Sequence, residues 1–168
     1  MAILDALDLC SFTKTSGSKG LQIFVPLNAD VTYQRTKAFA RCMAGGLEKI
    51  FPDLVLSRMG KHLRSGKVFV DWSQNDAKKT TVTAYSLRAK DHPTVSTPVS
   101  WAEVTKAAKT GEILRFESTA TLRRIKARGD LFAPVLSMRQ ELPPLRKLNS
   151  LLGMRLSRES AFFSKHRL

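Results

Sequence analysis

The sequence predicts an α/β fold in which a mainly antiparallel sheet is flanked by helices. Two kinds of segment indicate this: short runs of β-branched and aromatic residues bounded by turn residues, and longer runs with apolar residues three and four positions apart. A length of 168 residues allows one sizeable hydrophobic core. The hydrophobic share of 43% is typical of a globular chain rather than a disordered one.

The predicted strands form two groups along the chain. Residues 11–13 are a short strand candidate, which is followed by a glycine-rich loop and a buried strand at 21–27. Residues 67–72 and 80–87 are two further strand-like runs, separated by the polar residues 73–79. Because that polar run has the composition of a hairpin loop, we expect these two strands to pair antiparallel.

Three helices are predicted from their spacing and their end signals. The apolar spacing indicates a helix from about Thr32 to Phe51. Ser100 begins a second, short helix, with Glu103 completing a capping box at the third helical position. A third helix is expected over residues 119–128, ending at Gly129.

The composition changes after Pro143. Residues 144–168 carry six Lys or Arg and a single Glu, and their apolar residues follow no convincing period. We therefore predict a globular domain over residues 1–143 and a basic tail over residues 144–168 that is poorly ordered or weakly helical.

The chain is strongly basic, with a formal net charge of +14. This balance predicts attraction to polyanions such as nucleic acid, nucleotides or anionic membrane surfaces, and it does not choose among them. No stretch of 18 apolar residues is present, so we expect no membrane-spanning segment. The acidic residues near the start are unlike a signal peptide, and the two cysteines have no metal-ligand spacing. We expect two buried thiols and a cytoplasmic location.

A glycine- and serine-rich loop with two lysines leads into the strand at 21–27. Backbone N–H groups in such a loop, with lysine charge beside them, form a concavity suited to phosphate oxygens. The segment runs from Lys14 to Leu21. Ordinary turn chemistry uses the same residue types, so the loop alone leaves both interpretations open.

Asp71 is the sharpest candidate for chemistry. It lies in an otherwise apolar run, and a buried carboxylate there would cost several kcal/mol unless it is paired or bound to a metal. The alternative is a residue that faces water at the edge of a sheet or pairs with an arginine. Arg64, Lys67 and Arg88 are near enough in sequence or on the next strand candidate to form such a salt bridge.

These blocks together resemble the polymerase domain of bacterial ligase D, a member of the archaeo-eukaryotic primase superfamily. Order and spacing agree from about Ile3 to Pro143, which would make the chain a partial primase-polymerase domain corresponding to its C-terminal part. The matching segments are Phe12–Leu27, Gly66–Asn75, Ala84–Lys90, Val95–Glu103 and Gly129–Phe132.

The resemblance implies a nucleotide-binding site and a metal-binding carboxylate. The family's Ser-Gly-x-x-Gly-x-His motif, which holds the nucleoside triphosphate, falls on Ser16, Gly17, Gly20 and Gln22. Asp71 resembles the third metal-binding, catalytic carboxylate of the family. The basic positions that line the family's nucleotide site correspond to Arg64, Arg88 and, less clearly, Lys61.

Two departures from the family pattern bear on activity. Gln22 replaces the motif histidine and cannot carry positive charge, so triphosphate binding should weaken. The family's Asp-x-Asp pair upstream of the loop is absent from this sequence, since Asp5 and Asp8 lie three residues apart. Because two-metal phosphoryl transfer needs several carboxylates, we expect a site that is incomplete for catalysis.

The resemblance implies template-dependent addition of nucleotides at broken DNA ends during non-homologous end joining, with Mn²⁺ or Mg²⁺. The implied partners are DNA ends and nucleoside triphosphates, with a ligase and an end-binding protein as further candidates, at a cytoplasmic and nucleoid-associated location. Whether the chain itself is an enzyme stays open. The alternatives are a non-catalytic, basic nucleic-acid-binding fragment and one half of a split polymerase.

Overall fold

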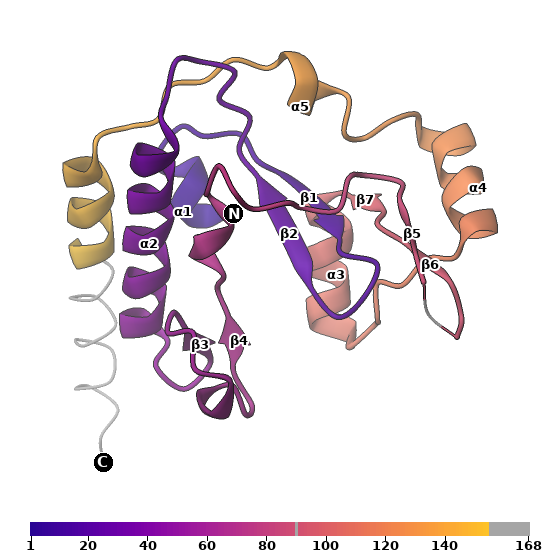
Figure 1. Cartoon of the computed structure of the whole chain (residues 1–168), viewed down its shortest axis with the longest axis horizontal. Helices are drawn as coiled ribbons and strands as arrows, with labels where there is room; N and C mark the ends of the chain where they lie inside the picture. The colour runs from indigo at the N-terminus through magenta and orange to yellow at the C-terminus, as the bar shows by residue number, and fades with distance from the viewer. Residues whose placement is uncertain (90, 155–168) are drawn as a thin grey trace. The chain divides into compact units, whose positions relative to one another are not determined.

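The structure is a computed structural model that describes residues 1–89 and 91–154 (Figure 1). The chain divides into two compact units. The first comprises Met1–Ala29 and Thr81–Gln140, and the second comprises Asp30–Thr80 together with the chain after Gln140. Each unit contains both helices and strands, and the pairing is mainly antiparallel, so the predicted α/β class is confirmed.

The first unit is built around a three-stranded antiparallel sheet in the order β2-β1-β7. Its strands are Phe12–Thr15 (β1), Leu21–Phe24 (β2) and Pro98–Val99 (β7). A second antiparallel pair joins Leu87–Arg88 (β5) to Thr94–Val95 (β6). The helices of this unit are Ala2–Asp5 (α1), Trp101–Thr110 (α3), Ser118–Arg128 (α4) and Pro134–Ser137 (α5).

A bidentate ion pair joins α3 to α4. Ser100 and Glu103 form the predicted capping box, which confirms that helix start. Nη1 of Arg124 lies 2.6 Å from Oε1 of Glu103, and Nη2 lies 3.1 Å from Oε2. Arg124 holds the pKa of Glu103 down to about 2, so this carboxylate keeps its charge, and with it the ion pair, until the solution is strongly acidic.

The second unit is organised by the long helix Tyr33–Ile50 (α2), whose N-cap is Thr32. The unit also contains a parallel pair, Val55–Leu56 (β3) with Val68–Phe69 (β4), and two short 3₁₀ turns, Lys61–Leu63 (η1) and Trp72–Gln74 (η2). Residues 145–154 form another helix, on which Leu148 and Leu152 are buried. This helix lies in the segment predicted as a basic tail. Residues 155–168 lie outside the described residues, and the boundary near residue 143 stays a prediction.

The predicted antiparallel pairing of residues 67–72 with 80–87 is wrong. β4 instead pairs with β3 in parallel, through bonds such as Val68 N–H to the Leu54 carbonyl at 2.8 Å. The second run is mostly irregular, because Tyr85 adopts a φ of 67°, which an extended strand does not allow. Only its end forms a strand, β5, and that strand pairs with β6.

Two further expectations need correction. Asp71 does not lie within a strand; it is the N-cap residue of η2. Cys10 is exposed and Cys42 only half-buried, so the thiols are not both buried as expected. None of the described helices combines the length and apolar character needed to cross a bilayer.

Adjacent glycines on α2 have different surroundings. A Cβ added to Gly46 would lie 2.4 Å from Cδ1 and 3.0 Å from Cγ of Leu152, so the helix at 145–154 approaches α2 at a position that has no side chain. A Cβ added to Gly45 would meet no atom within 4 Å. The first glycine is therefore required by packing, and the second is not.

We predict that Gly46→Ala lowers the free energy of unfolding by about 1–2 kcal/mol, because the clash with Leu152 outweighs the helix propensity of alanine. Gly45→Ala is the matched control and should raise the free energy of unfolding by up to about 1 kcal/mol. Urea unfolding of both variants checks this. Equal stabilisation by the two substitutions would show that Leu152 does not pack on α2 as described.

Candidate functional site

The predicted phosphate loop is the turn of the β1–β2 hairpin. The Ser16 N–H donates to the Gly20 carbonyl at 2.8 Å, which closes the turn. The backbone N–H groups of Ser18 and Gly20 both donate to Oγ of Ser16, at 3.2 and 3.1 Å. Two backbone donors thus converge on one oxygen atom. In the described structure that oxygen belongs to the loop's own serine.

Gly17 allows Arg88 to lie against this loop. Its φ is 66°, in the left-handed region that glycine tolerates best. A Cβ at this position would lie 2.5 Å from Cγ of Arg88 and 3.1 Å from the Ser96 nitrogen. The Thr94 hydroxyl also donates to the Gly17 carbonyl and so joins β6 to the loop. The structure therefore brings Arg88 to the glycine-rich loop, within the first unit.

Lys14 does not lie in the loop; it lies in β1, and its side chain is fully buried, with 0% exposed. Its ammonium donates to Oε1 of Gln22, to the Val82 carbonyl at 2.8 Å and to Oγ of Ser96 at 2.7 Å. Lys14 and Gln22 are directly paired in the register of β1 and β2. The sequence predicted Lys14 as a residue of the loop and gave no indication of its contact with Gln22.

Burial, together with the smaller effect of the Arg88 charge, lowers the pKa of Lys14 from 10.5 to about 8. Lysine at this pKa is mostly protonated at neutral pH and loses its charge as the pH rises through 8. Two cations thus lie close enough to repel each other beside the loop. An anion bound there would relieve that repulsion.

Asp71, in the second unit, is held by its own turn. Its Oδ1 accepts hydrogen bonds from the Ser73 N–H at 3.1 Å and the Ser73 hydroxyl at 2.6 Å, and its Oδ2 accepts one from Gln74 at 3.1 Å. Burial acts to raise the pKa of Asp71, but these hydrogen bonds and the charge of Lys79 hold it below the usual value. The carboxylate is therefore ionised at neutral pH and fixed in orientation. The salt bridge with an arginine, considered as an alternative, does not form among the described residues.

The two basic candidates of the second unit lie near η1. Arg64 donates to the Met59 carbonyl at 2.8 Å, and its guanidinium lies 3.9 Å from the ring centroid of Phe69. Lys61 begins η1 and is exposed. Arg64 is therefore held in place by its neighbours, whereas the Lys61 side chain lies largely in solvent.

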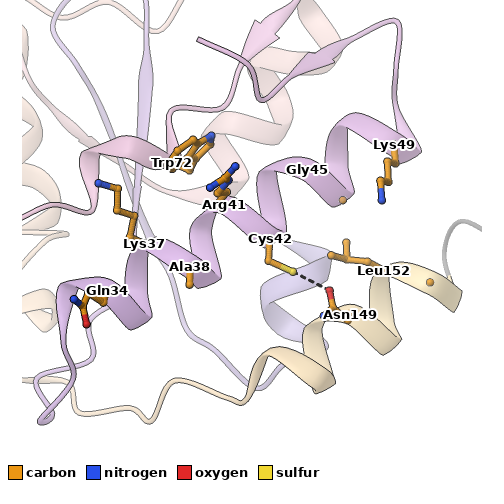
Figure 2. Close-up of a pocket in the computed structure, with 12 residues that line it drawn as sticks. Gln34, Lys37, Ala38, Arg41, Cys42, Gly45, Lys49, Trp72, Asn149 and Leu152 are labelled. Carbon is orange, nitrogen blue, oxygen red and sulfur yellow. Dashed lines mark hydrogen bonds between the residues drawn. The ribbon is translucent and has the colours of Figure 1, made fainter.

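A groove of about 750 Å³ follows α2 in the second unit (Figure 2). Figure 2 shows Arg41 directed toward Trp72, with its guanidinium 5.1 Å from the ring centroid, while the Cys42 thiol donates to Asn149 on the other side. Lys37 pairs with Asp76 at 2.5 Å, and Lys49 also lines the groove. Sequence analysis missed this face, although basic residues at 37, 41 and 49 recur at multiples of four.

Comparison with known proteins places the chain in a family. The family model described as LigD, primase-polymerase domain, matches residues 1–132. The chain belongs to the LigD primase-polymerase domain family. It is 44% identical over 154 residues to the multifunctional non-homologous end joining protein LigD of Mycolicibacterium smegmatis, with 92% of this chain and 19% of that protein aligned. This confirms the resemblance inferred from the sequence.

Two further relatives give the same result. The chain is 44% identical over 129 residues to the multifunctional non-homologous end joining DNA repair protein LigD of Mycobacterium tuberculosis, covering 77% of this chain and 16% of that protein. The solved polymerase domain from Mycobacterium tuberculosis ligase D, in complex with DNA, is 40% identical with a TM-score of 0.75. That match covers 83% of this chain and 47% of the solved chain. The chain thus spans a fifth or less of these LigD proteins and about half of the solved domain.

The LigD polymerase domain family consists of nucleotidyltransferases that in general depend on a metal ion. Among residues 1–89 and 91–154, no group of three His, Cys, Asp or Glu side chains could hold a metal ion. Asp71 alone does not fit the paired ions of phosphoryl transfer, which need several carboxylates. We therefore assign no chemical step to a metal ion from the residues described.

The structure brings together five of the residues predicted for the LigD nucleotide site, all in the first unit. They are Ser16, Gly17, Gly20, Gln22 and Arg88. The other three, Lys61, Arg64 and Asp71, belong to the second unit and are described within it. The roles of all eight stay predictions.

We predict that Gly17→Ala disturbs the loop, because its Cβ would clash with Arg88 and its φ is strained for alanine. The free energy of unfolding should fall by about 1–3 kcal/mol. Gly20→Ala is the matched control, since its Cβ would lie 3.5 Å from the nearest atom, Oγ of Ser16, and its φ is not positive. Thermal or urea unfolding measures both. A Gly17→Ala protein as stable as the control would contradict the described contact with Arg88.

Proposed function

We propose that this chain is the nucleotide- and DNA-binding part of a ligase D-type polymerase domain that acts in non-homologous end joining. The observation that supports this best is the β1–β2 loop with Arg88 against it, in a segment that matches the family. The relatives' names, as non-homologous end joining proteins and as a polymerase domain in complex with DNA, supply the process and the partner.

The loop would hold the polyphosphate of a nucleoside triphosphate. In the described state the Ser16 hydroxyl accepts from the N–H groups of Ser18 and Gly20. Rotation of the Ser16 side chain about its Cα–Cβ bond would move this oxygen away. The two converging N–H groups could then donate to a phosphate oxygen, as in a backbone nest. Gln22 would add an amide donor and Arg88 a positive charge. In the second unit, we propose Lys61 and Arg64 as further residues that bind the nucleotide.

We propose Asp71 as a carboxylate ligand of a catalytic Mn²⁺ or Mg²⁺ ion. An ionised carboxylate has about four lone-pair positions, and Asp71 uses three of them within its own turn. Asp71 could therefore coordinate a metal ion through its remaining lone pair while it still caps η2. The remaining ligands of a two-ion site would have to come from outside the described residues 1–89 and 91–154. Polymerisation by the chain alone should therefore be weak or absent.

DNA is the proposed macromolecular partner, and its ends are the proposed site of action. The formal net charge of +14 favours a nucleic-acid backbone, with an affinity that falls steeply as salt increases. A ligase and an end-binding protein are proposed as further partners, as the resemblance to ligase D implies.

The direct experiment uses the purified chain with Mn²⁺, ATP and a DNA duplex that carries a 3′ overhang. We expect binding of ATP and of DNA, and little templated extension. Asp71→Asn should abolish any increase in ATP affinity that Mn²⁺ produces. The free energy of unfolding should fall only slightly, because the asparagine oxygen can still cap η2 through Ser73 and only the bond from Gln74 is lost. Asp76→Asn, which lies in the same unit and pairs with Lys37, is the control and should leave the Mn²⁺ effect unchanged.

Three results would contradict parts of this proposal. Robust templated extension by the chain alone would show that its site is complete. Failure to bind ATP would contradict the role of the loop. An unchanged Mn²⁺ effect in Asp71→Asn would remove the carboxylate from the metal site.

The second candidate function is a nucleic-acid-binding module without catalysis. It is favoured by the absence, among residues 1–89 and 91–154, of a group of three side chains suited to a metal ion. This candidate predicts DNA binding with a steep salt dependence and no effect of either Mn²⁺ or Asp71→Asn on ATP. The same experiment therefore separates the two.

A further inference from the structure

The buried cation Lys14 has no role in the proposed function. Lys14 is fully buried in β1, and its ammonium has three acceptors, from Gln22, Val82 and Ser96. Burial of a lysine side chain is costly even when it is hydrogen-bonded, and a neutral residue would fill the same space at lower cost. A buried lysine beside a ligand loop is therefore a candidate for function.

The chemistry of the two side chains fixes how Gln22 is oriented. A lysine ammonium has three donors and no acceptor, so the amide oxygen of Gln22 must face it. The amide nitrogen must then point away from Lys14. Among the described residues this nitrogen has no hydrogen-bond partner. It is also not one of the buried nitrogen atoms that lack a partner, so it is accessible to solvent or to a ligand. It is thus a free donor held in one orientation.

Gln22 also lies close to the loop in the strand register. Thr15 pairs with Leu21 at the end of the hairpin, and Lys14 pairs with Gln22 one position further along. The loop, with its converging N–H groups, begins at Ser16 immediately beyond this end. The amide donor of Gln22 is therefore one residue pair away from the converging backbone donors.

We propose that Lys14 is a positioning residue for nucleotide binding. It orients the amide of Gln22 so that the NH₂ group donates to the polyphosphate. It also supplies, from the paired position on β1, the positive charge that glutamine lacks. This inference rests on the proposed nucleotide-binding function of the loop. It assigns a role to a residue outside the glycine-rich motif.

The neighbouring charges give the inference a pH dependence. Arg88 on β5 is the charged group that acts on Lys14, and it lies against the loop at Gly17. An anion at the loop would favour the protonated form of Lys14, so binding should raise the pKa of this lysine above about 8. Affinity for the anion should then fall as the pH rises through that value and Lys14 loses its charge.

The test measures ATP binding in the presence of Mg²⁺, with inorganic tripolyphosphate as a second probe that lacks base and sugar. Gln22→Met should weaken both probes by about 10-fold, the usual effect of losing one hydrogen bond to a charged group. Lys14→Met should weaken them at least as much. The double variant should be little weaker than Lys14→Met, because Lys14 acts partly through Gln22.

Lys14→Gln separates orientation from charge. Its amide can still donate to the Gln22 oxygen, so it should bind more tightly than Lys14→Met at pH 7. Both variants should lose the decline in affinity above pH 8 that the parent chain shows. Ser96→Ala is the matched control, because it removes another acceptor of Lys14 but leaves the contact with Gln22 in place. It should keep a decline in affinity with rising pH, but the decline should begin at a lower pH because the buried ammonium has lost one acceptor. Both Lys14 variants should lack that decline.

A measurement without ligand covers the case in which a Lys14 variant folds poorly or the parent chain binds no nucleotide. The side-chain amide of Gln22 should show two distinct proton resonances in NMR spectra of the parent chain, and they should shift between pH 7 and pH 9. Absence of that shift would overturn the inference even if ATP binds. A clear shift together with no binding of ATP or tripolyphosphate would overturn the proposed function, and the role of Lys14 with it.

A purely structural lysine would give a different pattern. The substitutions of Lys14 and Gln22 would then have additive effects on affinity, and affinity would not change between pH 7 and pH 9. Either result would overturn the inference.

Discussion

The need to satisfy the buried ammonium of Lys14 constrains the first unit more than any other single interaction. An unpaired charge in that position would cost several kcal/mol, so three acceptors from separate parts of the chain must meet it. They come from β2, from the irregular segment at Val82 and from the connection between β6 and β7 at Ser96. These contacts hold the hairpin against residues more than sixty positions later, and the hairpin carries the loop.

The same unit shows how the glycine-rich loop is supported by residues outside its motif. Gly17 is needed because Arg88 occupies the space that a side chain would fill. Thr94 and Ser96 attach the neighbouring strands to the hairpin through their hydroxyl groups. The ion pair of Glu103 with Arg124 joins the two helices that follow. The loop is therefore supported by side chains that neither the motif nor its spacing identifies.

Local signals in the sequence predicted the helices well and the strand pairing poorly. The capping box at Ser100, the N-cap at Thr32 and the terminal Gly129 act over a few residues, so they can be recognised without the fold. Strand pairing depends on distant partners: residues 67–72 look like half of a hairpin, but Leu54 and Leu56 bond to them first. Lys14 looked like a loop lysine because the sequence does not show which acceptors will surround it.

The family of this chain and the proposed roles of its site residues rest on different evidence. The match to the LigD family rests on the order and spacing of several segments, which survive the loss of individual functional groups. The chemistry depends on particular atoms: one carboxylate whose lone pairs are largely used, and a glutamine whose donor is oriented by a lysine. In the proposed function, the loop would be the nucleotide-binding half of the site, and Asp71 would belong to a metal-binding half. Since binding needs only convergent donors and positive charge, whereas two-ion chemistry needs several carboxylates, substitutions in the two halves should have separable effects.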